Sequence, residues 1–341
     1  MFQCMERSCV YIERTLPSGN VRKGLLGLID LEAYDYSRDT TSMVRPTEGT
    51  VESRLPARVR VREGASLEMP HIMVFIDDAA QQVIEPLGEQ KAQMQKLYDF
   101  DLMMGGGHLA GWRICGEQLP ALEQKLVHLG APEVMLEKYD HSGKPVVYAV
   151  GDGNHSLATA KVCWEQIKQT LTPEEQENHP ARYSLVELVN LHDESIVFEA
   201  IHRAVFNTDN AAFLEQAEAF WNGISKAEGD AHHVTCMAGG KQITIAVRGL
   251  TIGEVIGAAD TFCEGYLAEF GGEIDYIHGD DTVAEMASRD GCAGILLPSM
   301  NKAELYPTII KSGVFPRKSF SMGHAEEKRY YLECRTIRQE D

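Results

Sequence analysis

One short segment near the middle of the chain combines residue types that could bind an anion or transfer a proton. It is Gly151-Asp152-Gly153-Asn154-His155-Ser156, and it joins an apolar run to helix-forming residues. Glycines let backbone amides approach a ligand, and a helix N-terminus presents unpaired N–H groups and the positive end of the helix dipole. Asp152 and His155 add a carboxylate and an imidazole. The segment therefore predicts a phosphate site, with Ser156 or Asn154 capping the helix.

The same loop has two other interpretations. Gly-Asp-Gly-Asn is also an ordinary strand-to-helix turn, in which glycine supplies a positive φ and the polar side chains bond their own backbone. Gly-Asn-His also occurs in two-metal phosphoesterases, but those enzymes carry further Asp and His motifs and an acidic residue where this chain has Ser156. The residues leave the phosphate site and the ordinary turn open, and they disfavour the two-metal centre.

The elements around this loop follow from apolar patterning. An apolar, β-branched run at 146–150 indicates a buried strand, and residues 157–161 favour a helix. Residues 53–62 are rich in arginine, and Arg58, Arg60 and Arg62 alternate with valines, which is typical of an edge strand with one charged face. Further strands are predicted at 9–13, 23–29, 70–76 and 109–114, helices at 85–100 and 119–129, and a loop tip at 105–107.

A polar, proline-bounded segment at 171–180 predicts the boundary between two domains. Residues 1–170 form a strand-rich N-terminal domain that carries the loop, and residues 181–341 form a smaller α+β domain. In the second domain we expect a hairpin-like pair of strands at 183–191 and 196–205, helices at 211–221 and 260–270, and strands at 242–247, 293–298 and 329–337. The fold class is α/β or α+β, with mixed sheets and flanking helices.

Composition limits the partners. The chain of 341 residues has 51 acidic and 32 basic residues, a net charge of −19 that disfavours nucleic acid and anionic lipid and requires a local basic pocket for any anionic ligand. The eight cysteines include no Cys-x-x-Cys pair, and no run is long enough to span a membrane. We expect a cytoplasmic protein with free thiols and neither a nucleic-acid nor a membrane partner. Oligomeric state leaves no signal in the sequence.

Five blocks, in order along the chain, resemble the bacterial and archaeal domain of unknown function 1015 family. They are RKGLLG at 22–27, RPTEGT at 45–50 followed by Arg54, DGNH at 152–155, IHR at 201–203 and PRKSF at 316–320. The family loop is Asp-Gly-His-His-Arg, so Asn154 and Ser156 replace a histidine and an arginine, and Thr47 replaces another histidine. The chain lacks the Pro-Tyr-Asp segment near the start of family members, which predicts a shortened member or a fragment.

More locally, the loop resembles the phosphate loop of the ParB and sulfiredoxin superfamily, which includes nucleotide-binding segregation proteins and a free-serine kinase. This resemblance implies a ParB/sulfiredoxin-like first half. Sulfiredoxin chemistry needs a cysteine in the loop, and none lies between Cys115 and Cys163.

The resemblance implies which residues would complete a phosphate site. The binding candidates are Arg45, Arg54, Gly151, Gly153, Asn154, Ser156, Arg203, Arg317, Lys318 and Ser319. Glu48 or Asp152 could act as general base or hold Mg²⁺, and His155 or His202 could transfer a proton. Each has a plainer alternative: His202 and Arg203 would form a hydrogen-bonded structural pair, and residues 316–319 a loop before the last strand.

Three hypotheses follow. The first is an enzyme acting on a phosphorylated small molecule or nucleotide, a phosphotransferase or nucleotide hydrolase with Mg²⁺ as cofactor. The second is a ligand-binding or regulatory protein with a degenerate site, because Asn154 and Ser156 replace ionisable residues. The third is a partner-binding protein in which the loop is purely structural.

Overall fold

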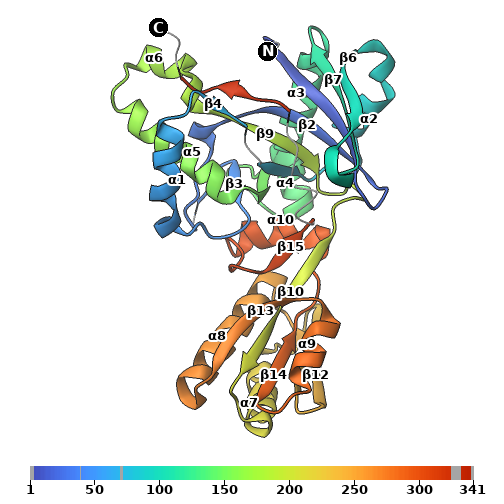
Figure 1. The fold of residues 1–341 in the computed structure, drawn as a ribbon, viewed down its shortest axis with the longest axis vertical. Coiled ribbons are helices and arrows are strands. Elements are labelled where there is room, and N and C mark those ends of the chain that lie inside the picture. Colours follow the sequence, from blue (N-terminus) through green and yellow to red (C-terminus); the bar gives the residue numbers. More distant parts are fainter. Residues whose placement is uncertain (1–3, 39, 70–71, 324–331, 339–341) are drawn as a thin grey trace. The chain divides into compact units, whose positions relative to one another are not determined.

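The chain divides into two compact units. The computed structural model describes residues 4–38, 40–69, 72–323 and 332–338. Unit 1 comprises Met1–Val197 and Gly323–Asp341, and unit 2 comprises Phe198–Met322. Each unit combines sheet and helices, as Figure 1 shows. The predicted class of mixed sheets with flanking helices is therefore confirmed.

Unit 1 is built on an eight-stranded mixed sheet with the order β3-β8-β5-β9-β2-β1-β7-β6. Most neighbours are antiparallel, but β3 with β8 and β5 with β9 run parallel. A small ribbon joins β4 to β16. The strands are β1 (Ser8–Thr15), β2 (Val21–Asp30), β3 (Val44–Pro46), β4 (Leu67–Glu68), β5 (Met73–Ile76), β6 (Gln95–Asp101), β7 (His108–Cys115), β8 (Tyr148–Asp152), β9 (Tyr183–Asn190) and β16 (Arg335–Thr336).

Helices contribute to the core of unit 1 together with the sheet. Leu157, Ala160 and Trp164 recur at helical spacing on α5 and are buried in the main core, where each large side chain contributes about 2 kcal/mol. The α-helices are α1 (Leu55–Glu63), α2 (Glu85–Glu89), α3 (Gln118–Leu129), α4 (Pro132–Tyr139), α5 (Asn154–Lys168) and α6 (Pro173–Asn178). The 3₁₀ turns are η1 (Leu31–Ala33), η2 (Glu52–Arg54), η3 (Lys91–Gln93), η4 (Met103–Gly105) and η5 (Pro180–Arg182).

The arginine-rich segment is a helix, so the predicted edge strand was wrong. Pro56 lies in the first turn of α1, where its missing N–H costs nothing. Leu55 and Val59, four residues apart, are buried, and α1 packs against α5. Alternating arginines are typical of a strand, but Leu55 and Val59 lie on one face of a helix, and their burial favours the helix.

Unit 2 has a second mixed assembly of sheet and helices. Its main sheet has the order β12-β11-β14-β10-β13, and β15 pairs with the beginning of β10. The strands are β10 (Phe198–Phe206), β11 (Ala231–Ala238), β12 (Lys241–Arg248), β13 (Glu273–His278), β14 (Cys292–Leu296) and β15 (Phe320–Met322). The helices are α7 (Asn210–Ile224), α8 (Ile252–Phe270), α9 (Asp280–Ala287) and α10 (Lys302–Lys311).

Other predictions need correction. The division falls after Val197, and the segment 171–180 lies inside unit 1. The predicted hairpin of strands 183–191 and 196–205 is wrong, because β9 pairs with β2 and β5 whereas β10 belongs to the sheet of unit 2. The predicted helix at 85–100 is a short helix α2 followed by strand β6. Of the last predicted strand, 329–331 lie outside the described residues and only Arg335–Thr336 is a strand.

Two expectations from composition can be compared with the structure. Every cysteine in the described ranges is a free thiol. None of the helices described is long and apolar enough to span a membrane.

Candidate functional site

Two parallel strands bring the predicted acidic residues to one edge of the sheet in unit 1. In the β3–β8 pair Pro46 lies opposite Val150, so the chain leaves both strands at the same edge. Thr47 fixes this arrangement, because its hydroxyl donates to the carbonyl of Val150 over 2.7 Å. Glu48 lies two residues after β3 at this edge, and Asp152 is the last residue of β8.

The loop after β8 starts α5 without a side-chain cap. Gly153, at φ 83°, occupies the N-cap position in a left-handed conformation that favours glycine. The predicted caps Asn154 and Ser156 are wrong: the side-chain amide of Asn154 donates to the Val150 carbonyl over 3.2 Å, and Ser156 lies within the first turn. Oδ1 of Asp152 accepts from the Gly153 amide over 2.7 Å. The backbone N–H groups of Asn154 and His155 have no acceptor among the described residues, as expected in a first turn.

Gly151 has a packing role. The register of β8 against β5 shifts between Met73 and Val74, which makes Gly151 the extra residue of a bulge. A Cβ at Gly151 would lie 2.2 Å from the ring of Phe75. Glycine is therefore required here by the approach of Phe75, and the bulge aims the end of β8 toward the start of α5.

His155 is held in one orientation. Its Nε2 accepts a hydrogen bond from the backbone amide of Val51 over 3.2 Å. Because Nε2 is an acceptor, the neutral ring carries its proton on Nδ1. Burial, followed by the charges of Arg58 and Arg54, lowers the pKa of His155 below its ordinary value. The ring is therefore a neutral hydrogen-bond donor at neutral pH.

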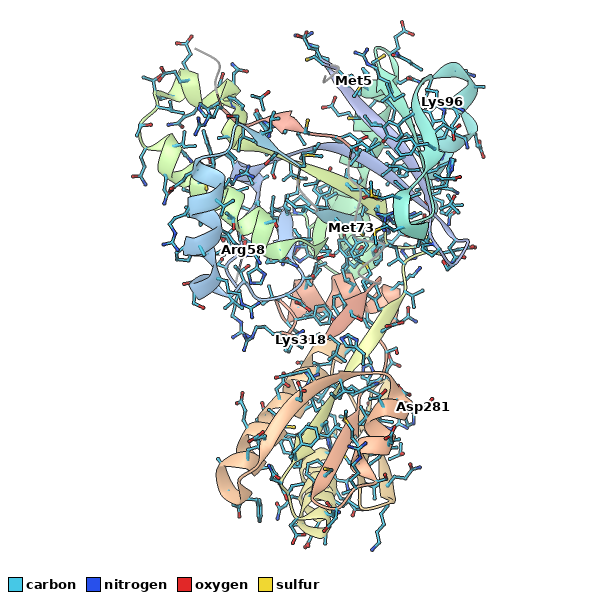
Figure 2. The ribbon with its side chains drawn as sticks, in the orientation of Figure 1. Met5, Arg58, Met73, Lys96, Asp281 and Lys318 are labelled. Atoms are coloured by element: carbon cyan, nitrogen blue, oxygen red, sulfur yellow. The ribbon has the colours of Figure 1, made fainter. Side chains whose placement is uncertain are left out.

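Two arginines at the start of α1 act on the first turn of α5. Arg54 and Arg58 are exposed, are one helical turn apart at the start of α1, and both act on His155 (Figure 2 labels Arg58). The first turn of α5 contains no acidic residue. Arg45 on β3 is buried, donates to the Ser42 carbonyl over 3.2 Å, and has a pKa lowered by burial. Arg54 and Arg58 thus bring two positive charges near the first turn of α5 in a chain that is acidic as a whole.

Two buried polar atoms lie beside the Val51–His155 hydrogen bond. Oδ1 of Asn154 and Oγ1 of Thr50 are both inaccessible and have no partner among the described residues. Buried polar atoms are nearly always paired with protein, ordered water or ligand.

The other predicted residues belong to unit 2, where His202 is paired within the unit. His202 is buried on β10; its Nδ1 accepts from the Leu297 amide over 3.1 Å and its Nε2 lies 2.8 Å from Oδ1 of Asp280. Burial lowers the pKa of His202, although Asp280 opposes this.

Arg203 and the 316–319 segment are also engaged within unit 2. Nε of Arg203 donates to Asp260 over 2.8 Å, Nη1 donates to the carbonyls of Ile201 and Lys318, and the guanidinium lies over Tyr276. These contacts hold Arg203 within unit 2, and its role at a ligand stays a prediction. Residues 316–319 form the turn before β15: Arg317 and Lys318 are exposed, and the hydroxyl of Ser319 donates to the Pro316 carbonyl. That residues of both units meet at one ligand stays a prediction.

No group of three or more His, Cys, Asp or Glu side chains in the described part of the chain is arranged to hold a metal ion. Mg²⁺ bound with a nucleotide needs only one or two carboxylates, because phosphate oxygens and water complete its shell. Glu48 and Asp152 therefore stay the candidates for such a role.

The sequence was compared with models of known protein families. A family model described as "Protein of unknown function (DUF1015)" matches residues 1–265. The chain belongs to this family. The resemblance deduced from the five sequence blocks is thereby confirmed. A comparison with curated proteins found no match.

Solved structures similar to this DUF1015 chain share little sequence with it. A C-terminally truncated SbnI from Staphylococcus aureus is 11% identical, with 88% of this chain and 83% of that chain covered and a TM-score of 0.43. A conserved hypothetical protein from Pyrococcus furiosus is 10% identical, with 88% and 91% covered and a TM-score of 0.39. A free serine kinase in complex with AMP is 10% identical, with 87% of each chain covered and a TM-score of 0.43. The ParB/sulfiredoxin-like assignment of the first half stays a prediction.

Two features of the site in this family member differ from, or are absent from, what the sequence predicts. Arg58 was assigned to a strand face, although its four-residue spacing from Arg54 and the proline at the start of α1 could have placed both on one helix face. The amide of Val51 is a backbone group 104 residues from His155 and leaves no signal in the sequence.

Proposed function

We propose that unit 1 binds the phosphate group of a phosphorylated small molecule or nucleotide at the start of α5. The observation that carries the proposal is that Arg54 and Arg58 lie at the start of α1, which packs against α5. Their charges both lower the pKa of His155 in the first turn of α5. In a chain with a net charge of −19, two guanidinium groups beside an uncapped helix N-terminus favour an anion at that point.

The donors at this point suit a phosphate. The backbone amides of Asn154 and His155, the Nδ1–H of His155 and the guanidinium groups are all hydrogen-bond donors. Arginine donates to phosphate through two parallel N–H groups, and helix N-termini offer several amides at once. A phosphate has enough acceptor oxygens to use both kinds of donor.

The finer proposal is an enzyme, a phosphotransferase or nucleotide hydrolase. Glu48 and Asp152 are its carboxylates, either as general base for the attacking group or as ligands of Mg²⁺ bound with the nucleotide. Phosphoryl transfer depends mainly on positioning and charge stabilisation, which the arginines and amides would supply.

The second candidate is a binding protein without chemistry. The hydrogen bond from Val51 supports it, because Nε2 of His155 cannot accept a proton while it accepts that amide. The replacement of two ionisable residues of the family loop by Asn154 and Ser156 points the same way.

One experiment separates these cases. ATP, ADP, GTP, CTP and inorganic phosphate are titrated calorimetrically with and without Mg²⁺, and the same mixtures are assayed for turnover. Phosphate binding predicts heat of binding with at least one of these compounds, and no binding by any of them refutes the proposal. Turnover that disappears in Glu48→Gln supports the enzyme, whereas binding without turnover supports the second candidate.

A further inference from the structure

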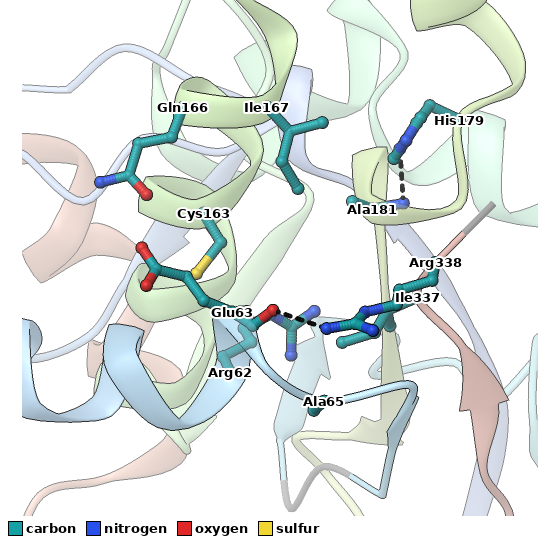
Figure 3. A pocket seen from close by; sticks show the side chains of 10 residues that line it. All are labelled: Arg62, Glu63, Ala65, Cys163, Gln166, Ile167, His179, Ala181, Ile337 and Arg338. Atoms are coloured by element: carbon teal, nitrogen blue, oxygen red, sulfur yellow. Dashed lines mark hydrogen bonds between the residues drawn. The ribbon is translucent and has the colours of Figure 1, made fainter.

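A cavity of about 320 Å³ lies in unit 1, apart from the site at the start of α5. It is lined by the end of α1, by the last two turns of α5, by η5 with the preceding His179, and by the two residues after β16 (Figure 3). Its volume is at the lower end of the range found for small-molecule pockets. The residues that line it differ from those of the proposed phosphate site, so it is a separate feature.

The cavity has an apolar interior and a polar rim. Cys163, Ala181 and Ile337 are buried at its wall, and Ile167 adds a half-buried apolar side chain. Burial raises the pKa of the Cys163 thiol, which keeps it neutral. An occupant of this wall would be a hydrocarbon or aromatic body, because few polar partners are offered there.

The polar groups at the cavity are mainly donors. Nδ1 of the buried His179 accepts from the Ala181 amide over 3.1 Å, so the neutral ring carries its proton on Nε2. Burial lowers the pKa of His179, which favours this neutral form. The exposed Arg338 donates one N–H to the Glu63 carbonyl over 3.2 Å, and its other N–H groups have no acceptor among the described residues. The donors therefore call for an acceptor group on the occupant.

The described side chains near the cavity carry one more positive charge than negative charge. Arg62 lies 2.5 Å from a carboxylate oxygen of Glu68, which Arg335 also contacts at 3.4 Å. Arg62 and Arg335 thus share the Glu68 carboxylate, whereas Arg338 contacts the backbone carbonyl of Glu63. With the side chain of Glu63, which also lines the cavity, these described residues comprise three guanidinium groups and two carboxylates. A single anionic group near Arg338 would balance this excess.

We propose that this cavity binds a small organic monocarboxylate, with the carboxylate at Arg338 and an apolar body against Cys163, Ala181 and Ile337. The site is independent of the phosphate proposal, since it uses other side chains. An apolar body of medium length fills the interior, while Arg338 selects for the negative charge.

The probes are octanoate, its neutral counterpart octanol, and the shorter butyrate. Binding to the full chain is measured by calorimetry, and the iodoacetamide labelling rate of Cys163 is measured by peptide mass spectrometry, because an occupant shields this thiol. We expect octanoate to bind and to slow labelling of Cys163, with about tenfold weaker binding for octanol, which lacks the charge-assisted hydrogen bond. Butyrate, with less apolar surface, should bind more weakly still.

Two variants sharpen the test. Arg338→Gln should bring octanoate down to the affinity of octanol, and the exposed Arg248→Gln in unit 2 is the matched control for the charge change. Ala65→Phe, at the cavity wall, should abolish protection of Cys163. Equal binding of octanoate and octanol, unchanged octanoate binding in Arg338→Gln, or a Kd for octanoate above about 1 mM would each overturn the proposal.

Discussion

The backbone amide of Val51 donates a hydrogen bond to Nε2 of His155 over 3.2 Å. This contact joins the segment after β3 to the first turn of α5, two parts of the chain that the parallel pair β3–β8 brings together. It fixes the ring orientation and leaves the Nδ1 proton of His155 available to a ligand. His155 is therefore as much a connection between two segments as a candidate binding residue.

Replacing His155 tests both roles. His155→Ala removes the acceptor of the Val51 amide and one donor to the bound phosphate, so we expect phosphate affinity to fall by about tenfold and the Val51 amide to exchange faster. Calorimetry and hydrogen exchange measure the two effects. His155→Gln keeps an acceptor and a donor, and it should retain part of both. Equal behaviour of wild type and His155→Ala in both measurements would exclude this role for the histidine.

The arginines at the start of α1 are tested by charge removal. In Arg54→Gln and Arg58→Gln we expect phosphate or nucleotide binding to weaken by about 10 to 100 fold each, because each loses a charge-assisted contact. The pKa of His155 should rise in both variants, since both guanidinium charges lower it. Calorimetry gives the affinities, and NMR titration of His155 gives the pKa.

Arg60 supplies the matched control. It is exposed on the same helix, and Arg60→Gln makes the same change in net charge two residues from Arg58, on a different face. Affinity in Arg60→Gln should stay close to wild type. An equal loss in all three variants would mean that only net charge matters and that no arginine contacts the ligand.

The loop and the helix after it could be predicted from local sequence, because glycine and helix-forming residues act over a few positions. Residues 151–156 do connect a strand to a helix, and the β1, β2, β7 and α3 elements lie where patterning placed them. The predicted N-cap residues of α5 are wrong because Gly153 occupies the N-cap position with a left-handed backbone, and the side chain of Asn154 bonds the Val150 carbonyl instead.

The wrong predictions concern segments whose structure depends on contacts with residues far away in the sequence. The arginine row became a helix because the buried pair Leu55 and Val59 packs with α5, a contact between segments about a hundred residues apart. The strands β9 and β10 follow each other closely in sequence, yet their partners lie in different sheets. Local periodicity does not reveal such partners, and neither does it reveal a backbone donor such as Val51.

Gly151 should be sensitive to a single methyl group. In Gly151→Ala the new Cβ would lie 2.2 Å from the Phe75 ring, so we expect unit 1 to lose about 1 to 3 kcal/mol of stability through overpacking. Phosphate affinity should fall as well, because the bulge aims the loop. Urea unfolding and calorimetry measure the two.

Gly64 is the control for this substitution. It follows α1 with φ −85°, and no atom lies within 4 Å of a Cβ placed there. Gly64→Ala should leave stability unchanged or raise it by up to about 1 kcal/mol, since alanine restricts the unfolded chain. If Gly151→Ala were as stable as Gly64→Ala, the packing role of Gly151 would be wrong.

The stability of unit 2 should depend on pH through His202. Burial lowers its pKa below the ordinary value of 6.5, so on acidification the unfolded chain takes up a proton before the folded chain does. Stability therefore falls as pH drops below about 6.5, by at most about 1.4 kcal/mol per pH unit, and the effect vanishes at higher pH. Urea unfolding at pH values between about 5 and 8, monitored by hydrogen exchange of peptides from unit 2, measures how the stability of unit 2 changes with pH.

Two variants test the sign of this dependence. In His202→Gln the stability of unit 2 should depend less steeply on pH below about 6.5. This holds even if the variant is less stable overall because it loses the hydrogen bonds to Leu297 and Asp280. His108 in unit 1 is the opposite case, because hydrogen bonds to Asp101 and Asp99 raise its pKa. Folded His108 takes up its proton first, so its contribution is present at low pH and is lost as pH rises. Replacing it by glutamine should therefore make acid destabilisation of unit 1 steeper. A slope for unit 2 that is the same in wild type and His202→Gln would show that His202 does not control it.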